Sequence, residues 1–176
     1  MTPSDEVRKG LVTAIPHLRA FAMSLCGRSA LADDLVQETL TKAWAKADSY
    51  QDGTNLMAWL FTILRNEFYS HLRKRKREVE DIDGAEAAQL VAVPGQIPNL
   101  ELGDFRTALA QLPDDQREAI ILVGASGFSY EEAANVMGCA VGTVKSRLSR
   151  ARTRLTELME GEPPVVSGSS KTGTGA

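Results

Sequence analysis

The chain has 176 residues, of which 43% are apolar, and a formal net charge of −3. This size suits one or two small globular domains, and the negative total excludes a uniformly basic nucleic-acid-binding protein. The longest apolar runs are far too short to span a bilayer, and the polar, acidic N-terminus is unlike a secretory signal peptide. We therefore expect a cytoplasmic protein.

The charge is distributed unevenly along the chain. Residues 1–77 carry 12 Lys and Arg against 8 Asp and Glu, whereas residues 78–103 carry none against 6. The segment from Lys145 to Arg154 alone has a charge of +5. Because contact with DNA depends on the local field more than on the total charge, the basic segments are candidates for binding a polyanion.

Helix signals dominate the first third of the chain. Residues 7–25 are predicted to be helical, with Pro16 as a kink or boundary. A second helix, capped by Asp33 or its neighbour, is predicted to run to about Ala47. Its apolar arc contains Leu35, Val36, Leu40, Ala43, Trp44 and Ala47, and its polar side contains Asp34, Gln37, Glu38, Thr41 and Lys42. We expect Trp44 and Trp59 to lie in the core.

A turn-forming loop and a long helix follow. The loop spans residues 51–55, and the helix is predicted from about Leu56 to Arg77, where it ends in five consecutive Lys and Arg residues. Five cations exceed what the helix dipole favours, so they form either a solvated tail or a phosphate clamp, and we favour the clamp. His71 has no carboxylate or second histidine nearby in the sequence, which argues against a metal site.

Residues 78–103 interrupt the helical pattern with acidic residues, prolines and glycine, as is typical of a flexible linker. Helices resume from Asp104, with a stripe of Phe105, Leu109 and Leu112. An apolar helix is predicted from Arg117 to Val123, before a turn at residues 124–127. The Ser-, Gly- and Thr-rich residues 161–176 are predicted to be disordered.

The strongest pattern begins at Ser129, which with Glu132 fits a capping box. Gly138 supplies a tight turn, and a second helix then places Val144, Leu148, Ala151 and Leu155 on one stripe. The opposite face contains Ser146, Ser149 and Arg150, with Lys145 at its edge and Arg147, Arg152 and Arg154 on the flanks. This order is typical of a helix-turn-helix that reads the DNA major groove, although a helical hairpin with a solvated face has the same outline.

Other chemistry is not indicated. Cys26 and Cys139 lie far apart without metal-type neighbours, and we interpret them as buried thiols in a reducing compartment, with a regulatory disulfide as the alternative. The sequence has no Gly-rich phosphate loop, metal-ligand cluster or nucleophile–base pair. We therefore expect neither an enzyme nor a bound cofactor or metal.

Four longer motifs stand out in the sequence: Asp34 to Trp44 (DLVQETLTKAW), Ala58 to Asn66 (AWLFTILRN), Leu112 to Glu118 (LPDDQRE) and Gly142 to Arg152 (GTVKSRLSRAR). The first two resemble region 2, and the last two region 4, of one family, the bacterial extracytoplasmic-function (ECF) sigma factors. The run Val123 to Ala134 (VGASGFSYEEAA) is similar to the alphaproteobacterial general-stress-response (EcfG-type) subgroup.

The resemblance implies an all-α RNA polymerase subunit with two small helical domains. Region 2 (1–77) would dock on the β′ clamp helices and open the promoter at the −10 element. Region 4 (104–160) would dock on the β flap and read the −35 element. The acidic linker (78–103) would join them, and a small anti-sigma protein would cover both domains.

The resemblance also implies roles for individual residues. Those that would meet polymerase are Asp34, Gln37, Glu38 and Lys42. Those that would contact the −10 element are Tyr50 and Asn55, in the loop that holds an unstacked base, and Tyr69, His71, Arg73 and Lys74, which border the opened strand. At the −35 element, base edges would be approached by Lys145, Ser146, Ser149 and Arg150, and phosphates held by Arg147, Arg152 and Arg154.

Two other functions use the same helix-turn-helix. A free-standing transcriptional regulator would carry a sensor or dimerisation module in place of region 2, and a decoy would only titrate another protein. The helix at 56–77 and its preceding loop favour the sigma factor over the regulator, because a repressor does not need them. The intact basic recognition helix argues against the decoy.

Overall fold

The computed structural model describes residues 2–80 and 100–161. Most of the predicted linker and nearly all of the predicted disordered tail lie outside these ranges. Within them the chain is all-α, as predicted, without a strand. The helices are α1 (Asp5–Cys26), α2 (Ser29–Ala45), α3 (Leu56–Glu80), α4 (Leu100–Ala110), α5 (Asp114–Ile120), α6 (Tyr130–Met137) and α7 (Val141–Glu160), with short helical turns η1 (Ala47–Ser49) and η2 (Ile121–Ala125).

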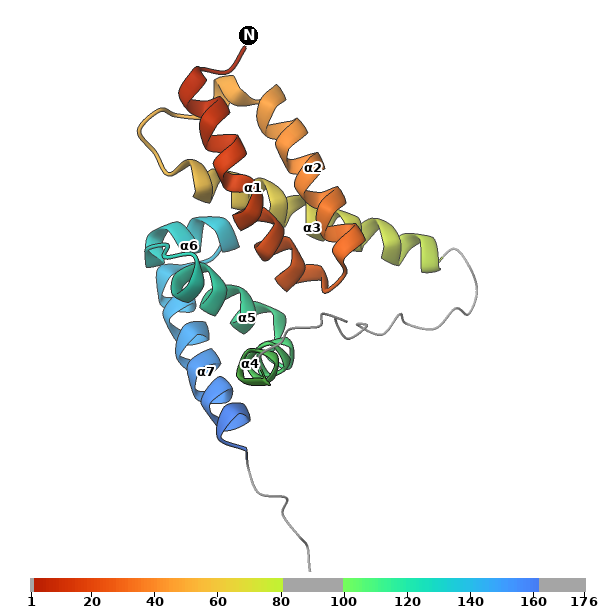
Figure 1. The fold of residues 1–176 in the computed structure, drawn as a ribbon, viewed down its shortest axis with the longest axis vertical. Coiled ribbons are helices and arrows are strands. Elements are labelled where there is room, and N and C mark those ends of the chain that lie inside the picture. Colours follow the sequence, from red (N-terminus) through yellow and green to blue (C-terminus); the bar gives the residue numbers. More distant parts are fainter. Residues whose placement is uncertain (1, 81–99, 162–176) are drawn as a thin grey trace, which may run out of the picture.

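The first three helices pack on one another around a shared apolar core (Figure 1). Its fully buried side chains include Leu18, Phe21, Leu35, Leu60 and Leu64. Pro16 does not end α1, which continues to Cys26. Val12 and Pro16 both lie on the exposed side of α1, so the Val12 carbonyl that loses its helical partner can be hydrated.

Helix α2 begins earlier than predicted. It starts at Ser29 after Arg28, which provides no side-chain cap, and Asp33 lies inside the helix. The Asp33 carboxylate instead accepts a hydrogen bond of 2.8 Å from Arg19 of α1. The prediction for Trp44 was also wrong: 45% of its surface is exposed, because it lies at the edge of the apolar arc.

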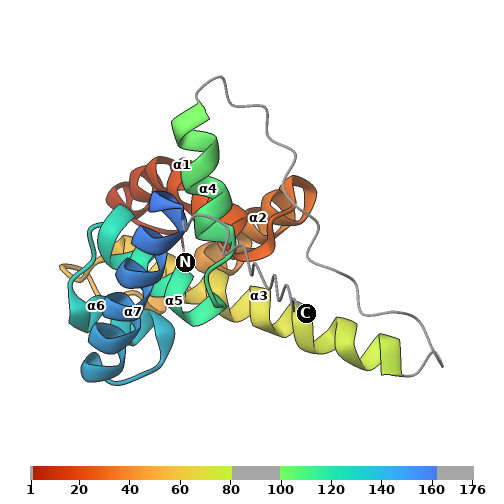
Figure 2. The same ribbon diagram turned by 90° about the horizontal axis from the view of Figure 1, so that it is seen from below.

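Helix α3 has two different halves. Its N-terminal half is buried at Leu60, Phe61, Leu64 and Phe68, whereas every residue from 71 to 80 is exposed. The helix has 25 residues and is about 37 Å long, so its basic end projects beyond the body of the molecule (Figure 2). It ends at Glu80, and the first residues of the predicted linker are therefore helical.

The C-terminal helices form the predicted helix-turn-helix. Ser129 and Glu132 make both hydrogen bonds of the capping box at the start of α6. Gly138 ends α6 with a φ of 64°, a left-handed conformation that glycine adopts at little cost. Helix α7 then packs on α5 and α6.

The capping box gives a first testable expectation. Replacing Ser129 by alanine should lower the free energy of unfolding by about 1 kcal/mol, because the Glu132 amide loses its acceptor. Urea unfolding followed by circular dichroism would measure this loss. Ser126→Ala is a suitable control, because Ser126 precedes the box and the box remains intact. An equal loss in the two variants would contradict the assignment.

The two helical groups are in contact with each other. Helix α3 packs against α6, and α1 against α5. The Phe61 ring stacks on Phe21 with centroids 4.5 Å apart and meets Phe128 edge-on at 5.1 Å. One apolar cluster therefore includes residues of both groups, an arrangement that no sequence pattern predicted.

The two cysteines lie within or at the edge of the folded interior. Cys26 is buried and Cys139 half-buried, and both are free thiols. Burial raises the pKa of the Cys26 thiol above its usual value.

Across residues 2–80 and 100–161, no helix combines the length and apolar character that crossing a membrane requires.

Candidate nucleic-acid and polymerase interfaces

Helix α7 presents the amphipathic arrangement expected of a recognition helix. Val144, Leu148 and Ala151 are buried against the domain. Six of the seven predicted DNA-contacting side chains are exposed: Lys145, Ser146, Ser149, Arg150, Arg152 and Arg154. A face of hydroxyls and cations is therefore available to a polyanion along the length of the helix.

The seventh residue, Arg147, has a different environment. Its guanidinium is half-buried and lies 3.2 Å from the Asp115 carboxylate of α5, and it also donates to the Cys139 thiol sulfur at 3.8 Å. Arg147 therefore ties α7 to α5, and Asp115 partly neutralises its charge. Lys145 is also positioned by a neighbour, because its ammonium lies 5.5 Å from the centre of the Tyr130 ring.

A groove runs beside the exposed face of α7. It has a volume of about 360 Å³ and lies between the start of α5, at Pro113 and Gln116, and the side chains of Ser149, Arg150 and Arg154. Three predicted DNA contacts thus line one groove. Arg154 also forms an exposed ion pair of 3.2 Å with Glu157, which such solvent exposure makes weak.

The predicted polymerase-contacting residues lie on the polar side of α2, part of which faces α3. Asp34, Gln37 and Glu38 are exposed. Lys42 is half-buried and donates a hydrogen bond to Glu67 of α3, which raises the pKa of the Lys42 ammonium. The first three residues are therefore available to a partner, while Lys42 also holds α2 against α3.

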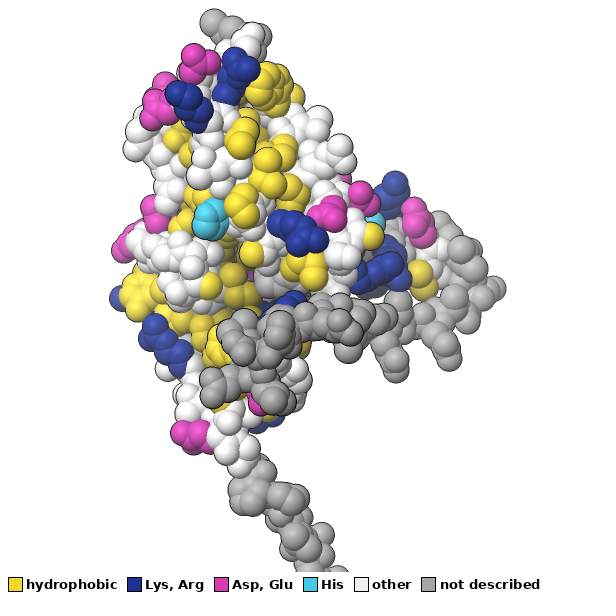
Figure 3. Space-filling view, in the orientation of Figure 1, with side chains coloured by type: hydrophobic (Ala, Val, Ile, Leu, Met, Phe, Trp, Pro, Cys, Tyr) yellow, Lys and Arg dark blue, Asp and Glu magenta, His cyan; other side chains and the backbone are white. Residues whose placement is uncertain are grey.

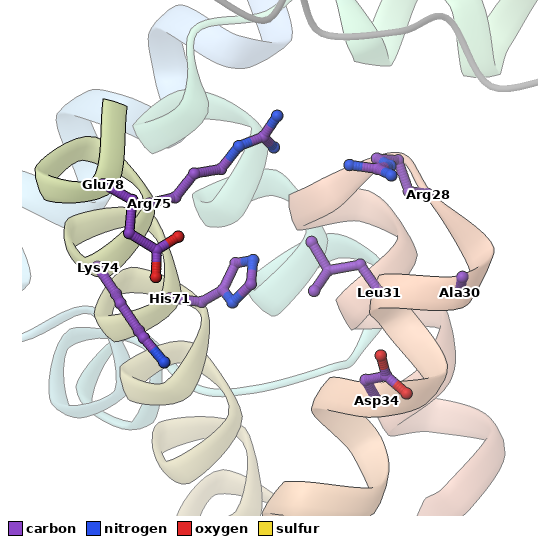
Figure 4. Close-up of a pocket in the computed structure, with 8 residues that line it drawn as sticks. All are labelled: Arg28, Ala30, Leu31, Asp34, His71, Lys74, Arg75 and Glu78. Atoms are coloured by element: carbon purple, nitrogen blue, oxygen red, sulfur yellow. The ribbon is translucent and has the colours of Figure 1, made fainter. Parts of the chain in front are cut away.

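A cleft of about 450 Å³ separates the start of α2 from the projecting half of α3. Arg28 and Asp34 line it from one side, and His71, Lys74 and Arg75 from the other, with His71 pointing into the space between the helices (Figure 4). Lys and Arg side chains gather where this half of α3 leaves the body (Figure 3). Two of the predicted −10 residues, His71 and Lys74, thus share a cleft with the predicted polymerase contact Asp34.

The loop before α3 is held by local hydrogen bonds. The Tyr50 hydroxyl donates to the Thr54 carbonyl at 2.6 Å, and the Tyr50 ring lies 5.3 Å from that of Trp59. Asn55 accepts from the Ala58 amide at 3.2 Å and so caps α3. Its amide group also donates to Glu132 of α6 at 2.9 Å, which links the loop to the helix-turn-helix.

The predicted −10 residues do not converge on one pocket. Asn55 and His71 are sixteen positions apart, or about 24 Å along a helix. Tyr69 and His71 point to opposite sides of α3, because two positions correspond to roughly 200° of rotation. Tyr69 donates its hydroxyl to Glu118 of α5, while His71 faces α2 and Arg73 contacts Ser70 at 3.0 Å.

The Asn55–Glu132 contact leads to an expectation about pH. Hydrogen bonds from Asn55 and from the Ser129 amide lower the pKa of Glu132 below its usual 4.5. A depressed pKa means that the contact stabilises the fold above pH 4.5 and is lost as the pH falls through the lowered value. Carboxyl-carbon NMR titration should give a Glu132 midpoint below 4.5 that rises in Asn55→Ala. An unchanged midpoint would contradict the role of Asn55.

Comparison with known protein families agrees with this division into two groups of helices. Residues 11–78 match the family model of sigma-70 region 2, and residues 102–155 match that of sigma-70 region 4. The chain is also 60% identical over 159 residues to the ECF RNA polymerase sigma factor EcfG of Rhodopseudomonas palustris, covering 90% of this chain and 88% of the relative. The chain belongs to the ECF RNA polymerase sigma factors.

Other relatives and solved structures agree with this membership. The sigma factor is 35% identical to SigM of Bacillus subtilis over 142 residues, covering 78% of this chain and 85% of SigM. Its fold matches the sigma factor RpoE in a co-crystal structure with the anti-sigma factor NepR from Bartonella quintana. That match has a TM-score of 0.79 at 57% identity and covers 91% of this chain and all of the other.

Three residues of this sigma factor were missed by the sequence-based reasoning. Arg65, Glu118 and Glu132 connect the two regions, through the Arg65–Glu118 ion pair of 2.8 Å and the Asn55–Glu132 hydrogen bond. In the sequence, Arg65 and Glu118 belong to two separate motifs, and Glu132 completes a capping box with Ser129. Arg65 and Glu118 are 53 positions apart in the sequence, and Asn55 and Glu132 are 77 positions apart, so no local pattern indicates either contact.

Proposed function

We propose that this sigma factor directs core RNA polymerase to promoters of a general stress response of the EcfG type. The exposed cationic face of α7 is the observation that carries this proposal. Buried apolar residues fix the orientation of α7, and its hydroxyls and arginines point outward, as readout of base edges requires. The chain acts by binding and strand opening, without covalent chemistry of its own, in the cytoplasm where polymerase works.

The proposed roles follow the positions of the side chains. Lys145, Ser146, Ser149 and Arg150 approach base edges of the −35 element. Arg152 and Arg154 contact phosphates, and Arg147 adds a phosphate contact from its position beside Asp115. The exposed Asp34, Gln37 and Glu38, with Lys42, meet the β′ clamp helices, and region 4 docks on the β flap.

At the −10 element we propose a track along α3. The loop from Tyr50 to Asn55 holds an unstacked base, and His71, Arg73 and Lys74 hold the strand backbone at the far end. The 24 Å separation of about sixteen helical positions suits a strand of several nucleotides, since one strand advances roughly 3.4 Å per nucleotide. Tyr69 becomes available to the strand once it leaves Glu118.

An anti-sigma factor is the proposed regulator. The similar sigma factor from Bartonella quintana was crystallised with the anti-sigma factor NepR. A small protein of the same kind would cover both regions of this chain and block docking on polymerase.

A test of the function uses core polymerase with and without the chain. Genomic DNA fragments of the source organism are transcribed in vitro, and the start sites are mapped by sequencing. We expect a set of start sites that share upstream elements and require the chain. Start sites that do not depend on the chain, together with tight sequence-specific binding without polymerase, would favour a free-standing helix-turn-helix regulator.

A further inference from the structure

A partly buried polar cluster joins the two regions. It consists of Arg65 and Tyr69 on α3 and Glu118 on α5, and is called here the interdomain polar cluster. Glu118 is only 1% exposed. Its two oxygens accept hydrogen bonds from Arg65, at 2.8 Å, and from the Tyr69 hydroxyl. The Arg65 guanidinium also lies 4.6 Å from the centre of the Tyr69 ring.

A second carboxylate of region 4 makes a similar contact at the other end of the buried half of α3. Glu132 accepts a hydrogen bond of 2.9 Å from the Asn55 side chain. Two acidic groups of region 4 therefore accept hydrogen bonds from three side chains of region 2: a guanidinium, a phenol and a carboxamide. Tyr69 and Asn55 are both among the residues proposed to contact the −10 element.

These three groups are also the ones that a single DNA strand uses. A guanidinium pairs with phosphate, an aromatic ring stacks on an unstacked base, and a carboxamide hydrogen-bonds to a base edge. Burial and the Glu118 carboxylate raise the pKa of Tyr69, so its hydroxyl stays protonated and continues to donate. A carboxylate that accepts from both Arg65 and Tyr69 resembles, in charge and in acceptor geometry, a phosphate of the strand.

We propose that Arg65 is a further single-strand DNA contact, and that Glu118 and Glu132 of region 4 occupy the strand-binding groups of α3 in the free protein. Region 4 and an opened promoter strand then compete for the same side chains. This inference rests on the proposed function, because it requires region 2 to bind an opened strand.

The chemistry of the interdomain polar cluster suits a contact that must break when the two regions separate. A buried ion pair gains little net stability over an apolar contact, because both charges lose their hydration. When the regions separate, Arg65 and Glu118 regain water, which offsets the lost attraction. The pair therefore fixes how the regions fit together without making their separation prohibitively unfavourable.

The test compares full-length variants by small-angle X-ray scattering and by fluorescence anisotropy with a fluorescein-labelled (dT)20 oligonucleotide. In Glu118→Gln with Glu132→Gln we expect a larger radius of gyration than in the wild type. We also expect (dT)20 binding to tighten by roughly 10- to 150-fold, the range that a charge-assisted hydrogen bond from the released Arg65 guanidinium to a phosphate provides. The matched control is Glu131→Gln with Glu160→Gln, which removes two exposed acidic groups of the same region and should match the wild type in size.

Arg65→Gln separates the DNA contact from the domain contact. It removes the same ion pair as Glu118→Gln and should also enlarge the molecule, but without tightening (dT)20 binding. Added to the Glu118→Gln, Glu132→Gln variant, it should abolish most of the gained affinity. Circular dichroism checks that each variant is folded. Glu132→Gln alone is a second variant that disturbs the fold less, because the Asn55–Glu132 hydrogen bond is exposed.

Three results would overturn the proposal. The first is a Glu118→Gln, Glu132→Gln variant with the size and (dT)20 affinity of the control. The second is a Glu118→Gln, Glu132→Gln variant that has a larger radius of gyration than the wild type but the (dT)20 affinity of the control. The third is a gain in (dT)20 affinity that persists when Arg65→Gln is added to that variant. Wild-type transcription with core polymerase reports on the proposed function separately, so its failure is distinguishable from each of these results.

Discussion

Replacing Phe61 by alanine is expected to lower the free energy of unfolding by about 3–5 kcal/mol, the largest effect of any substitution considered. Phe61 is 1% exposed, stacks on Phe21 and meets Phe128 edge-on. Its removal would leave a cavity where α1, α3 and the segment before α6 meet. Both the region 2 core and the contact between regions would weaken.

Urea unfolding monitored by circular dichroism measures this loss. Phe105→Ala is a matched control, because the same atoms are removed from a side chain that is 42% exposed, and its effect should stay within about 0.5 kcal/mol. Similar losses in the two variants would mean that Phe61 does not organise the core.

Replacing Arg150 by alanine is expected to cost about 1–3 kcal/mol of discrimination at one position of the −35 element. Arg150 is exposed on α7 and lines the groove beside α5, with no ion-pair partner among the described residues. A guanidinium that is free in this way can bind a base edge without first breaking a contact within the protein.

Holoenzyme binding to a set of −35 variants measures the change. In Arg150→Ala, one base position should become permissive while the others keep their preference. Arg154→Ala is the comparison: it should weaken binding on all variants alike and reduce the salt dependence by about one counterion. Uniform weakening in Arg150→Ala would exclude Arg150 from base readout.

Local patterns in the sequence predicted much of this structure. The Ser129–Glu132 capping box, the left-handed Gly138 and the burial of Val144, Leu148 and Ala151 depend on residues at most seven positions apart, and all three were confirmed. Leu155, the last residue of the predicted stripe, is half-buried. Such features are determined by backbone geometry and by neighbours on the same helix. The same limit explains why the sequence did not predict that α1 continues past Pro16 and that Trp44 is exposed, because both residues lie on an exposed part of their helix.

The contacts between the regions could not be predicted in this way. Arg65 and Glu118 each sit in a motif whose local pattern is complete without the other, and they meet only because α3 packs against the C-terminal helices. The individual DNA contacts remain predictions for a related reason. Exposure shows which side chains of α7 are available, whereas their base partners depend on a promoter.

The Glu132 carboxylate accepts one hydrogen bond from the Ser129 backbone amide, just before α6, and another from the side chain of Asn55, which caps α3. A mutation there would loosen the contact between the regions and also weaken the start of the helix-turn-helix. Within residues 2–80 and 100–161, the Glu118 side chain accepts hydrogen bonds only from Arg65 and Tyr69 and caps no helix. During divergence of such proteins, substitution at position 118 would therefore change only the stability of the contact between the two regions. Substitution at position 132 would change both that contact and the start of α6.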